Sequence, residues 1–195
     1  IKLNLNCIKN ISKERILSEL YKIFKLHNIN ILLDNKDIKQ IFLLAFPEFV
    51  YLERMKKFLY LLKEKTLIQS PEIIFSILLV DVKDNHEYFS HKYKVSNKLK
   101  KDLIFMAENY RKYKNERNYI KKDLNKNIYK FGKINMKKIL GFIYCSEKNF
   151  SNRLLIKTIE EINKLEIPSF PFNGQYLINK GLVDGKKIGF ALKEL

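Results

Sequence analysis

Glycine is almost missing from most of this 195-residue chain, since none of its six glycines occurs before residue 132. Proline is equally scarce there, with only Pro47 and Pro71, and tryptophan is absent from the whole chain. Tight β-hairpins usually need glycine or asparagine at positive φ, so this composition argues against a protein rich in β-hairpins. Long glycine-free runs with apolar residues three and four apart instead predict an all-α helical array of about seven to nine helices.

Cysteines and long apolar runs are also few. Cys7 and Cys145 are too few for a disulfide framework and indicate a reducing compartment, for which we expect the cytoplasm. Neither has a second cysteine or a histidine nearby, so both are expected to be small buried side chains. The apolar stretch 73–80 is far shorter than the ~20 residues of a membrane span, so no membrane partner is expected. The chain begins at Ile1 with no signal-peptide pattern, and we interpret it as part of a longer protein.

The usual catalytic motifs do not occur. There is no glycine-rich phosphate loop, and there is no D-x-D pair of the kind that holds two metal ions. His86 and His91 are five residues apart, which places them ~140° apart around a helix and prevents them from sharing a metal ion. We therefore expect no catalytic residue, no metal site and no cofactor on this chain.

Start and stop signals divide the chain into expected helices. Ser12 is a good N-cap for a first helix that reaches about His27. Ser70-Pro71-Glu72 starts a mostly apolar helix to about Val82, which we expect to be the central element of the core. Residues 84–95 are expected to form a polar, aromatic connection, after which Ser96 caps another helix. The remaining expected helices are 35–45, 48–65, 116–131, 134–145 and 151–165.

Positive charge is concentrated in one segment. Residues 92–138 contain 16 basic and 4 acidic residues, whereas 1–91 contain 14 and 11, and 139–195 contain 8 and 6. Such a segment favours a polyanionic partner, because each phosphate that is neutralised releases counterions. A Lys-rich composition from an AT-biased genome is the alternative explanation of the overall charge.

Aromatic residues lie among these basic residues. They are Tyr93, Tyr110, Tyr113, Tyr119, Tyr129 and Phe131. Such rings either offer stacking faces to nucleic acid or pack between helices, and the sequence leaves both interpretations open.

The composition changes at Ile167, because the last 29 residues hold two of the four prolines and four of the six glycines. We therefore divide the chain into a first helical region, 1–30, a helical body, 31–166, and a Pro/Gly-rich tail, 167–195.

The tail is expected to form a helical hairpin. Gly181 ends its first helix in the left-handed conformation, and Asp184 caps the second. The first turn of that second helix, with Lys186 and Lys187, is expected to seat a phosphate. Gly189 is expected to allow this second helix to approach a neighbour closely. The alternative is a helical hairpin whose glycines serve packing only.

Two segments carry a family resemblance. Near the start, the order is Ile11-Ser12-Lys13-Glu14-Arg15-Ile16, followed by Glu19-Leu20. In the tail, Phe170-Pro171-Phe172-Asn173-Gly174 is followed by Leu177, Ile178, Gly181, Gly185, Gly189 and Leu192. Together with the turn Phe46-Pro47-Glu48, they resemble segments of bacterial tRNA nucleotidyltransferases, the CCA-adding enzymes and their poly(A) polymerase relatives. The resemblance extends over nearly the whole chain, but residues 84–166 match in helical pattern only.

The resemblance implies a catalytic head followed by helical neck, body and tail domains that hold tRNA, with residues 1–30 as the end of the neck. The family's G-S-x-R-D motif, its Mg²⁺-binding D-x-D pair and its nucleotide-selecting E-D-x-x-R element do not occur here. Mg²⁺ and CTP or ATP would therefore belong to a head outside this sequence, and this chain alone is expected to be inactive. The implied partners are tRNA and, where the head is encoded separately, that head chain.

The candidate residues fall into two groups. The RNA-binding candidates are Lys133, Lys180, Lys186 and Lys187. The candidates for structural roles are Ser12, Glu14, Arg15, Gly174, Gly181, Gly185 and Gly189. Two other interpretations stay open, namely a stand-alone helical nucleic-acid-binding module with a helix-hairpin-helix-like phosphate clamp, and an inactive remnant of a decayed gene.

Overall fold

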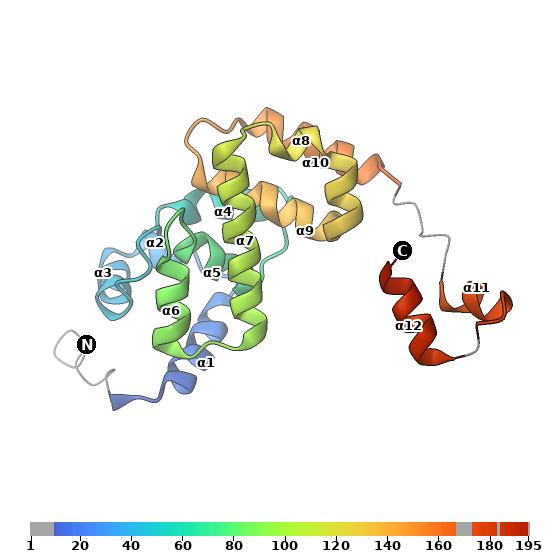
Figure 1. Ribbon diagram of the computed structural model, residues 1–195. Helices are drawn as coiled ribbons and strands as arrows, with labels where there is room; N and C mark the ends of the chain where they lie inside the picture. Colours follow the sequence, from blue (N-terminus) through green and yellow to red (C-terminus); the bar gives the residue numbers. More distant parts are fainter. Residues whose placement is uncertain (1–9, 167–172, 183, 195) are drawn as a thin grey trace. The chain divides into compact units, whose positions relative to one another are not determined.

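The computed structural model describes residues 10–166, 173–182 and 184–194, and within these ranges it contains helices and no strands (Figure 1). The all-α expectation is confirmed. Nine of the described helices have nine or more residues, and α2, α8 and α11 have four to six. The helices are α1 (Lys13–Phe24), α2 (Ile31–Asp34), α3 (Lys36–Ala45), α4 (Arg54–Lys63), α5 (Pro71–Leu79), α6 (Asn85–Tyr93), α7 (Asn97–Asn115), α8 (Tyr119–Lys122), α9 (Leu124–Ser146), α10 (Asn152–Lys164), α11 (Gly174–Asn179) and α12 (Gly185–Glu194).

The chain divides into two compact units, residues 1–164 and residues 165–195. Helices α1 to α10 belong to the first unit, and helices α11 and α12 belong to the second.

Serine side chains start three of the helices, as the sequence predicts. Ser12, Ser70 and Ser96 each accept a hydrogen bond from the backbone amide three residues later, at 3.3, 3.4 and 3.3 Å. Each bond satisfies one of the amides that a helix start leaves without an intrahelical partner.

Helix α5 is the centre of the first unit, as expected. Every residue of α5 except Glu72 is buried, and Ile74, Phe75, Ile77 and Leu78 have no exposed surface. Helices α1, α4, α6, α7 and α9 all pack against it. A helix that is apolar on all sides is stable only when other elements cover it on all sides, and this one ends at Leu79, shortly before the expected Val82.

A cluster of aromatic rings fills the core beside α5. Its members are Phe24, Phe42, Phe46, Phe49, Phe75, Phe89 and Tyr93. Phe24 and Phe75 meet edge to face with their ring centroids 4.8 Å apart, and Phe42 stacks on Phe49 at 5.2 Å. The burial of large aromatic rings stabilises a core strongly, so the contacts within this cluster hold α1, α3 and α6 against α5.

Residues 84–95 are not a connection, because α6 occupies most of this range, and that expectation is wrong. The buried positions of α6 are His86, Phe89, Ser90 and Tyr93, which follow the i, i+3, i+4, i+7 spacing of a helix face. Two of these four side chains are polar, so the spacing of apolar residues in the sequence does not reveal this buried face. The Ser90 hydroxyl donates to the carbonyl of His86 at 2.7 Å, so the helix itself satisfies the buried hydroxyl.

Two other expected boundaries also differ. The helix expected from residue 48 begins at Arg54, because the Glu48 carbonyl accepts a hydrogen bond from the Asn85 side chain at 2.9 Å rather than from a helical amide. The helix expected over 116–131 is divided at Asp123, whose φ of −121° and ψ of 34° separate α8 from α9.

Helix α9 changes direction at Gly132, where φ is 79° and ψ is 157° (Figure 1). This backbone conformation is open to glycine and strained for residues with a Cβ. The part of α9 after Gly132 is buried through residues Ile139 to Cys145, whereas in the part before it only Asn127 and Ile128 are buried. Gly132 therefore separates a largely exposed part of α9 from its core-packed part.

The second unit contains a helical hairpin formed by α11 and α12. Gly181 has a φ of 92° and follows the end of α11, and the Asp184 carboxylate accepts a hydrogen bond from the Lys186 amide at 2.9 Å. A Cβ at Gly174 would lie 3.7 Å from Ile188, whereas a Cβ at Gly189 would meet nothing within 4 Å. The expectation that Gly189 allows a close approach is therefore wrong for the described residues. The motif residues 170–172 lie outside them.

Replacing Gly132 with alanine is expected to lower the free energy of unfolding by about 1–3 kcal/mol, because the added Cβ strains the backbone at this φ. No atom lies within 4 Å of that Cβ, so steric overlap adds nothing to the effect. Urea denaturation measures the change, and Lys130→Ala on the exposed side of α9 is the control, with a change below about 0.5 kcal/mol. Equal stability of Gly132→Ala and the parent would contradict the positive φ assigned to residue 132.

Acid is expected to destabilise the first unit through His86. Burial lowers the pKa of its imidazole, with Arg111 adding to the effect, while Glu87, Asp81 and Asp84 oppose it. An unfolded chain therefore takes up this proton at a higher pH than the folded one, and stability falls as the pH drops through the ordinary histidine range near 6.5.

Thermal unfolding of a His86→Leu variant between pH 7.5 and 5.5 tests this assignment. The variant is expected to lose less stability across this range than the parent does. His91→Gln, a change at an exposed position on the same helix, should leave the parent's pH dependence unaltered. Identical pH profiles for the parent and His86→Leu would exclude His86 as the titrating group.

Candidate nucleic-acid interface

The basic segment 92–138 keeps most of its positive charge uncompensated. Four of its 16 basic residues pair with carboxylates, namely Lys92 with Glu48, Lys114 and Arg117 with Glu147, and Lys122 with Glu116. Arg111 and Lys133 bind backbone carbonyls, at 2.9 Å in both cases. The other ten have no ion-pair partner among the described residues: Lys94, Lys98, Lys100, Lys101, Lys112, Lys121, Lys126, Lys130, Lys137 and Lys138.

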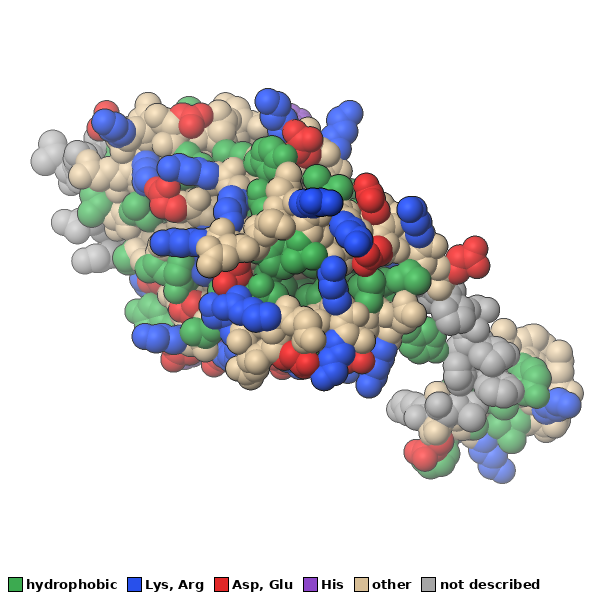
Figure 2. Space-filling view, turned by 90° about the horizontal axis from the view of Figure 1, so that it is seen from above, with side chains coloured by type: hydrophobic (Ala, Val, Ile, Leu, Met, Phe, Trp, Pro, Cys, Tyr) green, Lys and Arg blue, Asp and Glu red, His purple; other side chains and the backbone are tan. Residues whose placement is uncertain are grey.

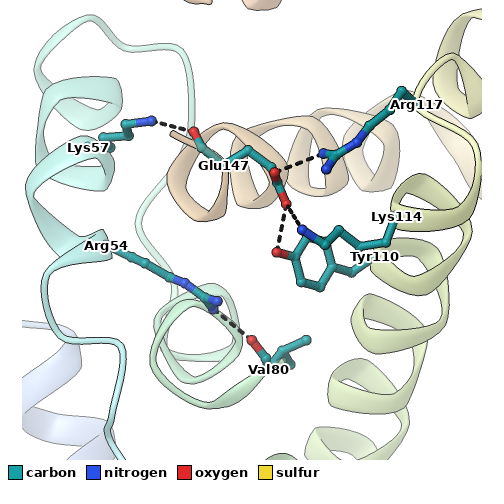
Figure 3. Close-up of polar contacts among 7 residues, drawn as sticks. All are labelled: Arg54, Lys57, Val80, Tyr110, Lys114, Arg117 and Glu147. Atoms are coloured by element: carbon teal, nitrogen blue, oxygen red, sulfur yellow. Dashed lines mark hydrogen bonds and ion pairs between the residues drawn. The ribbon is translucent and has the colours of Figure 1, made fainter. Parts of the chain in front are cut away.

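Glu147 neutralises the end of α7 (Figure 3). Its carboxylate accepts hydrogen bonds from the Tyr110 hydroxyl at 2.8 Å, from Lys114 Nζ at 3.0 Å and from Arg117 Nη1 at 2.8 Å. Burial by itself raises the pKa of this carboxyl, but the three donors outweigh that effect and hold the pKa below its usual range. Burial and the Glu147 carboxylate raise the pKa of Tyr110 well above its usual range.

Helix α4 supplies cations that bind helix ends rather than solvent (Figure 3). Lys57 donates to the carbonyls of Tyr144 at 3.0 Å and Glu147 at 2.6 Å, at the end of α9. Arg54 donates to the Val80 carbonyl at 2.7 Å, at the end of α5. Such contacts satisfy carbonyls that helix ends leave open and complement the negative end of the helix dipole. These two cations therefore serve the fold.

Part of the uncompensated charge lies beside two aromatic rings, on a surface that we call the α7–α9 face. Lys98, Lys101 and Phe105 come from α7, and Phe131 and Lys138 come from α9. The rings of Phe105 and Phe131 meet edge to face with centroids 5.2 Å apart, and both are half-buried.

Two lysines of this face, Lys98 and Lys138, lie near the carboxyl of Asp102. Burial and nearby Glu72 raise the pKa of Asp102, whereas Lys138 and Lys98 act in the opposite direction. Asp102, Phe105 and Lys138 also line one small hollow of about 30 Å³. Figure 2 shows one side of the first unit, on which Lys and Arg side chains lie among hydrophobic side chains and several Asp and Glu side chains.

The aromatic residues of the basic segment divide into two groups. Tyr93, Tyr110 and Tyr113 are buried between helices, which supports packing as their role. Tyr129 is 53% exposed, Phe131 is half-buried, and the Tyr119 hydroxyl donates to Asn109 at 2.9 Å. The rings of this second group are more exposed at the surface than those of the first.

The RNA-binding candidates lie in both units. Lys133 donates to the carbonyl of Asn163 and so supports the end of α10. Lys180 lies over the Tyr176 ring at 5.9 Å, and Lys186 and Lys187 are exposed at the start of α12. The Asp184 carboxylate already occupies the amide of Lys186, so a phosphate at this helix start could not use that amide as well.

The N-terminal motif residues belong to the first helix. Ser12 is the N-cap of α1, and Glu14 and Arg15 are both exposed in its first turn. Arg15 also lines an open cleft of about 350 Å³ together with Ile11 and Phe46. In the turn that follows Phe46, the buried Glu48 forms an ion pair with Lys92, so this turn ties α6 to the core.

Other reactive or membrane-related features are few. Burial raises the pKa of the Cys145 thiol to about 12, which leaves it unreactive near neutral pH, and Cys7 lies outside the described residues. Among the residues that the structure describes, no three His, Cys, Asp or Glu side chains gather as metal ligands would. No helix in the described ranges has the length and hydrophobicity needed to cross a membrane.

Comparison with known proteins returned no matching family model, no matching curated protein and no matching solved structure.

Replacing Glu147 with glutamine is expected to lower the free energy of unfolding by about 1–3 kcal/mol, because three donors lose a charged acceptor in a largely buried position. The loss, measured by urea denaturation at neutral pH, should shrink as the pH falls below the ordinary glutamate value of 4.5. The reason is that the unfolded parent chain takes up the Glu147 proton near the ordinary pKa and the folded chain only at the lowered one, so the stabilising effect is lost between the two. Glu160→Gln, at an exposed site on α10, is the matched control. A loss that persists unchanged in acid would contradict this account.

Proposed function

We propose that this chain binds folded RNA, with tRNA as its natural partner, as the holding part of a tRNA nucleotidyltransferase whose catalytic head lies elsewhere. The observation that carries the proposal is the set of ten uncompensated lysines in segment 92–138, part of which borders the half-buried rings of Phe105 and Phe131. Uncompensated lysines repel each other, and a polyanion relieves this repulsion while releasing its own counterions.

The arrangement suits contact with an RNA backbone. Lysines act as point charges that reach phosphates without reading bases, and an RNA helix is recognised largely by its shape and its backbone. The two family-like segments, at residues 11–20 and in the tail, support tRNA as the specific RNA. The unreactive Cys145 is compatible with a reducing, cytoplasmic setting, which we propose as well.

A stand-alone nucleic-acid-binding module is the second candidate. Exposed Lys186 and Lys187 at the start of α12, in a hairpin that turns at Gly181, favour it. Such a module would bind duplexes of any sequence, whereas the holding part of a tRNA enzyme would prefer tRNA over a plain duplex of similar length.

Charge reversal in the two units distinguishes their contributions. The body variant carries Lys98→Glu, Lys101→Glu and Lys138→Glu, and the tail variant carries Lys186→Glu and Lys187→Glu. Both are expected to weaken tRNA binding, and the slope of log K against log salt should decrease by about 0.7–0.9 for each phosphate that the variant no longer neutralises. Filter binding over a series of salt concentrations measures affinity and slope together.

The control variant carries Lys36→Glu and Lys63→Glu, two exposed lysines of the first unit outside the basic segment. It should keep most of the parent's affinity. Equal reductions of log K per reversed lysine in the control and body variants would mean that net charge, and not the α7–α9 face, governs binding. No detectable binding of tRNA by the parent at low salt would refute the proposed function.

A further inference from the structure

A second feature of the first unit lies where the C-terminal end of α7 meets α8, α9 and α10. A cleft of about 300 Å³ opens there, with walls formed by Tyr113, Ile120, Leu140, Phe150 and Leu154. All of these side chains except the half-buried Leu154 are buried. The rings of Tyr113 and Phe150 lie 6.1 Å apart at a tilted angle. The result is an apolar slot with aromatic walls.

The opening of this cleft is positively charged. Arg117 lines it with its guanidinium 4.9 Å from the centre of the Tyr113 ring, and its side chain is 57% exposed. Lys121 lines it as well and also lines a neighbouring polar hollow of about 360 Å³ together with Lys122, Asp123 and Lys126, of which Lys122 is paired with Glu116. Lys121 and Lys126 have no ion-pair partner among the described residues. The apolar slot and the basic hollow thus share one lining residue, Lys121.

We propose that the cleft takes one unpaired nucleotide of the bound RNA, with its base between the apolar walls and its flanking phosphates in the basic hollow. This inference rests on the proposed RNA-binding function and adds a site to it. An aromatic slot beside a cationic hollow matches the two parts of a nucleotide, a flat ring system and an anionic backbone. An apolar side chain of a partner protein would fit the slot but would leave the basic hollow without a counterpart.

Two neutral polar side chains line the cleft, the carboxamide of Asn118 and the hydroxyl of Thr158. The hydroxyl of Thr158, which lines it, already donates to the Leu154 carbonyl at 2.8 Å. Recognition by stacking tolerates different bases, because every base has a π face. The site therefore favours unpaired over paired nucleotides, with weak preference among bases.

Two substitutions on α10 test the site. Leu154→Trp places a large ring in the cleft, and Ile156→Trp adds the same ring two residues later, at an exposed position that does not line the cleft. The probes are a blunt RNA hairpin and the same hairpin with a single-stranded 3′ tail. Leu154→Trp is expected to lower affinity for the tailed hairpin about tenfold and to leave affinity for the blunt hairpin unchanged, because one base can no longer stack in the cleft. Ile156→Trp should alter neither.

A third variant, Phe150→Trp, reports on the site directly and does not depend on the fold tolerating Leu154→Trp. The chain has no tryptophan of its own, so the emission of this variant comes from the cleft alone. The tailed hairpin is expected to quench this emission and the blunt hairpin is not, whereas the emission of Ile156→Trp should respond equally to both.

The outcomes separate this inference from the proposed function. If parent and variants bind blunt and tailed hairpins equally, RNA binding stands and the nucleotide site is refuted. If the parent binds neither RNA, the proposed function fails and the site fails with it. Quenching of Phe150→Trp by free AMP without any binding of RNA would refute the RNA nucleotide as the occupant.

Discussion

The carboxylate of Glu147 is the contact that the basic half of this molecule depends on. It lies directly after α9 and accepts hydrogen bonds from Tyr110, Lys114 and Arg117, while its own carbonyl accepts one from Lys57. One acidic residue thus joins α4, α7 and α9 at a point where positive charges would otherwise repel each other. Since segment 92–138 has only four acidic residues of its own, the compensating carboxylates of Glu147 and Glu48 come from outside it.

The internal contacts of some cations determine which basic residues stabilise the fold and which stay available at the surface. Cations near helix ends are used internally, as Arg54 and Lys57 are, because open carbonyls and the helix dipole stabilise them there. Ten lysines of segment 92–138 form no ion pair with a carboxylate among the described residues, although Lys98 and Lys138 lie close enough to Asp102 to lower its pKa. The remaining surface is basic and carries aromatic rings among the lysines. This combination contributes little to folding stability but suits the binding of a polyanion.

Local signals in the sequence predicted much of the fold, and particular residues show why they did not predict the rest. Ser12, Ser70 and Ser96 start helices because a serine hydroxyl bonds to a nearby amide, an interaction within a few residues. Helix α6 escaped prediction because its buried face contains His86 and Ser90, whose burial depends on helices distant in sequence. The rings of Tyr110 and Tyr113 look alike in sequence to that of Tyr129, and only packing buries the first two.

The sequence by itself determined the helical class, the main helix starts, the central position of α5 and the location of the positive charge, because periodicity, caps and composition are local properties. Tertiary structure alone decided which charges are compensated, which rings are exposed and where clefts form. Glu147 meets Arg117 across 30 residues of chain, and Tyr113 meets Phe150 across a similar separation. No local pattern encodes such pairings, because they exist only once the helices have packed.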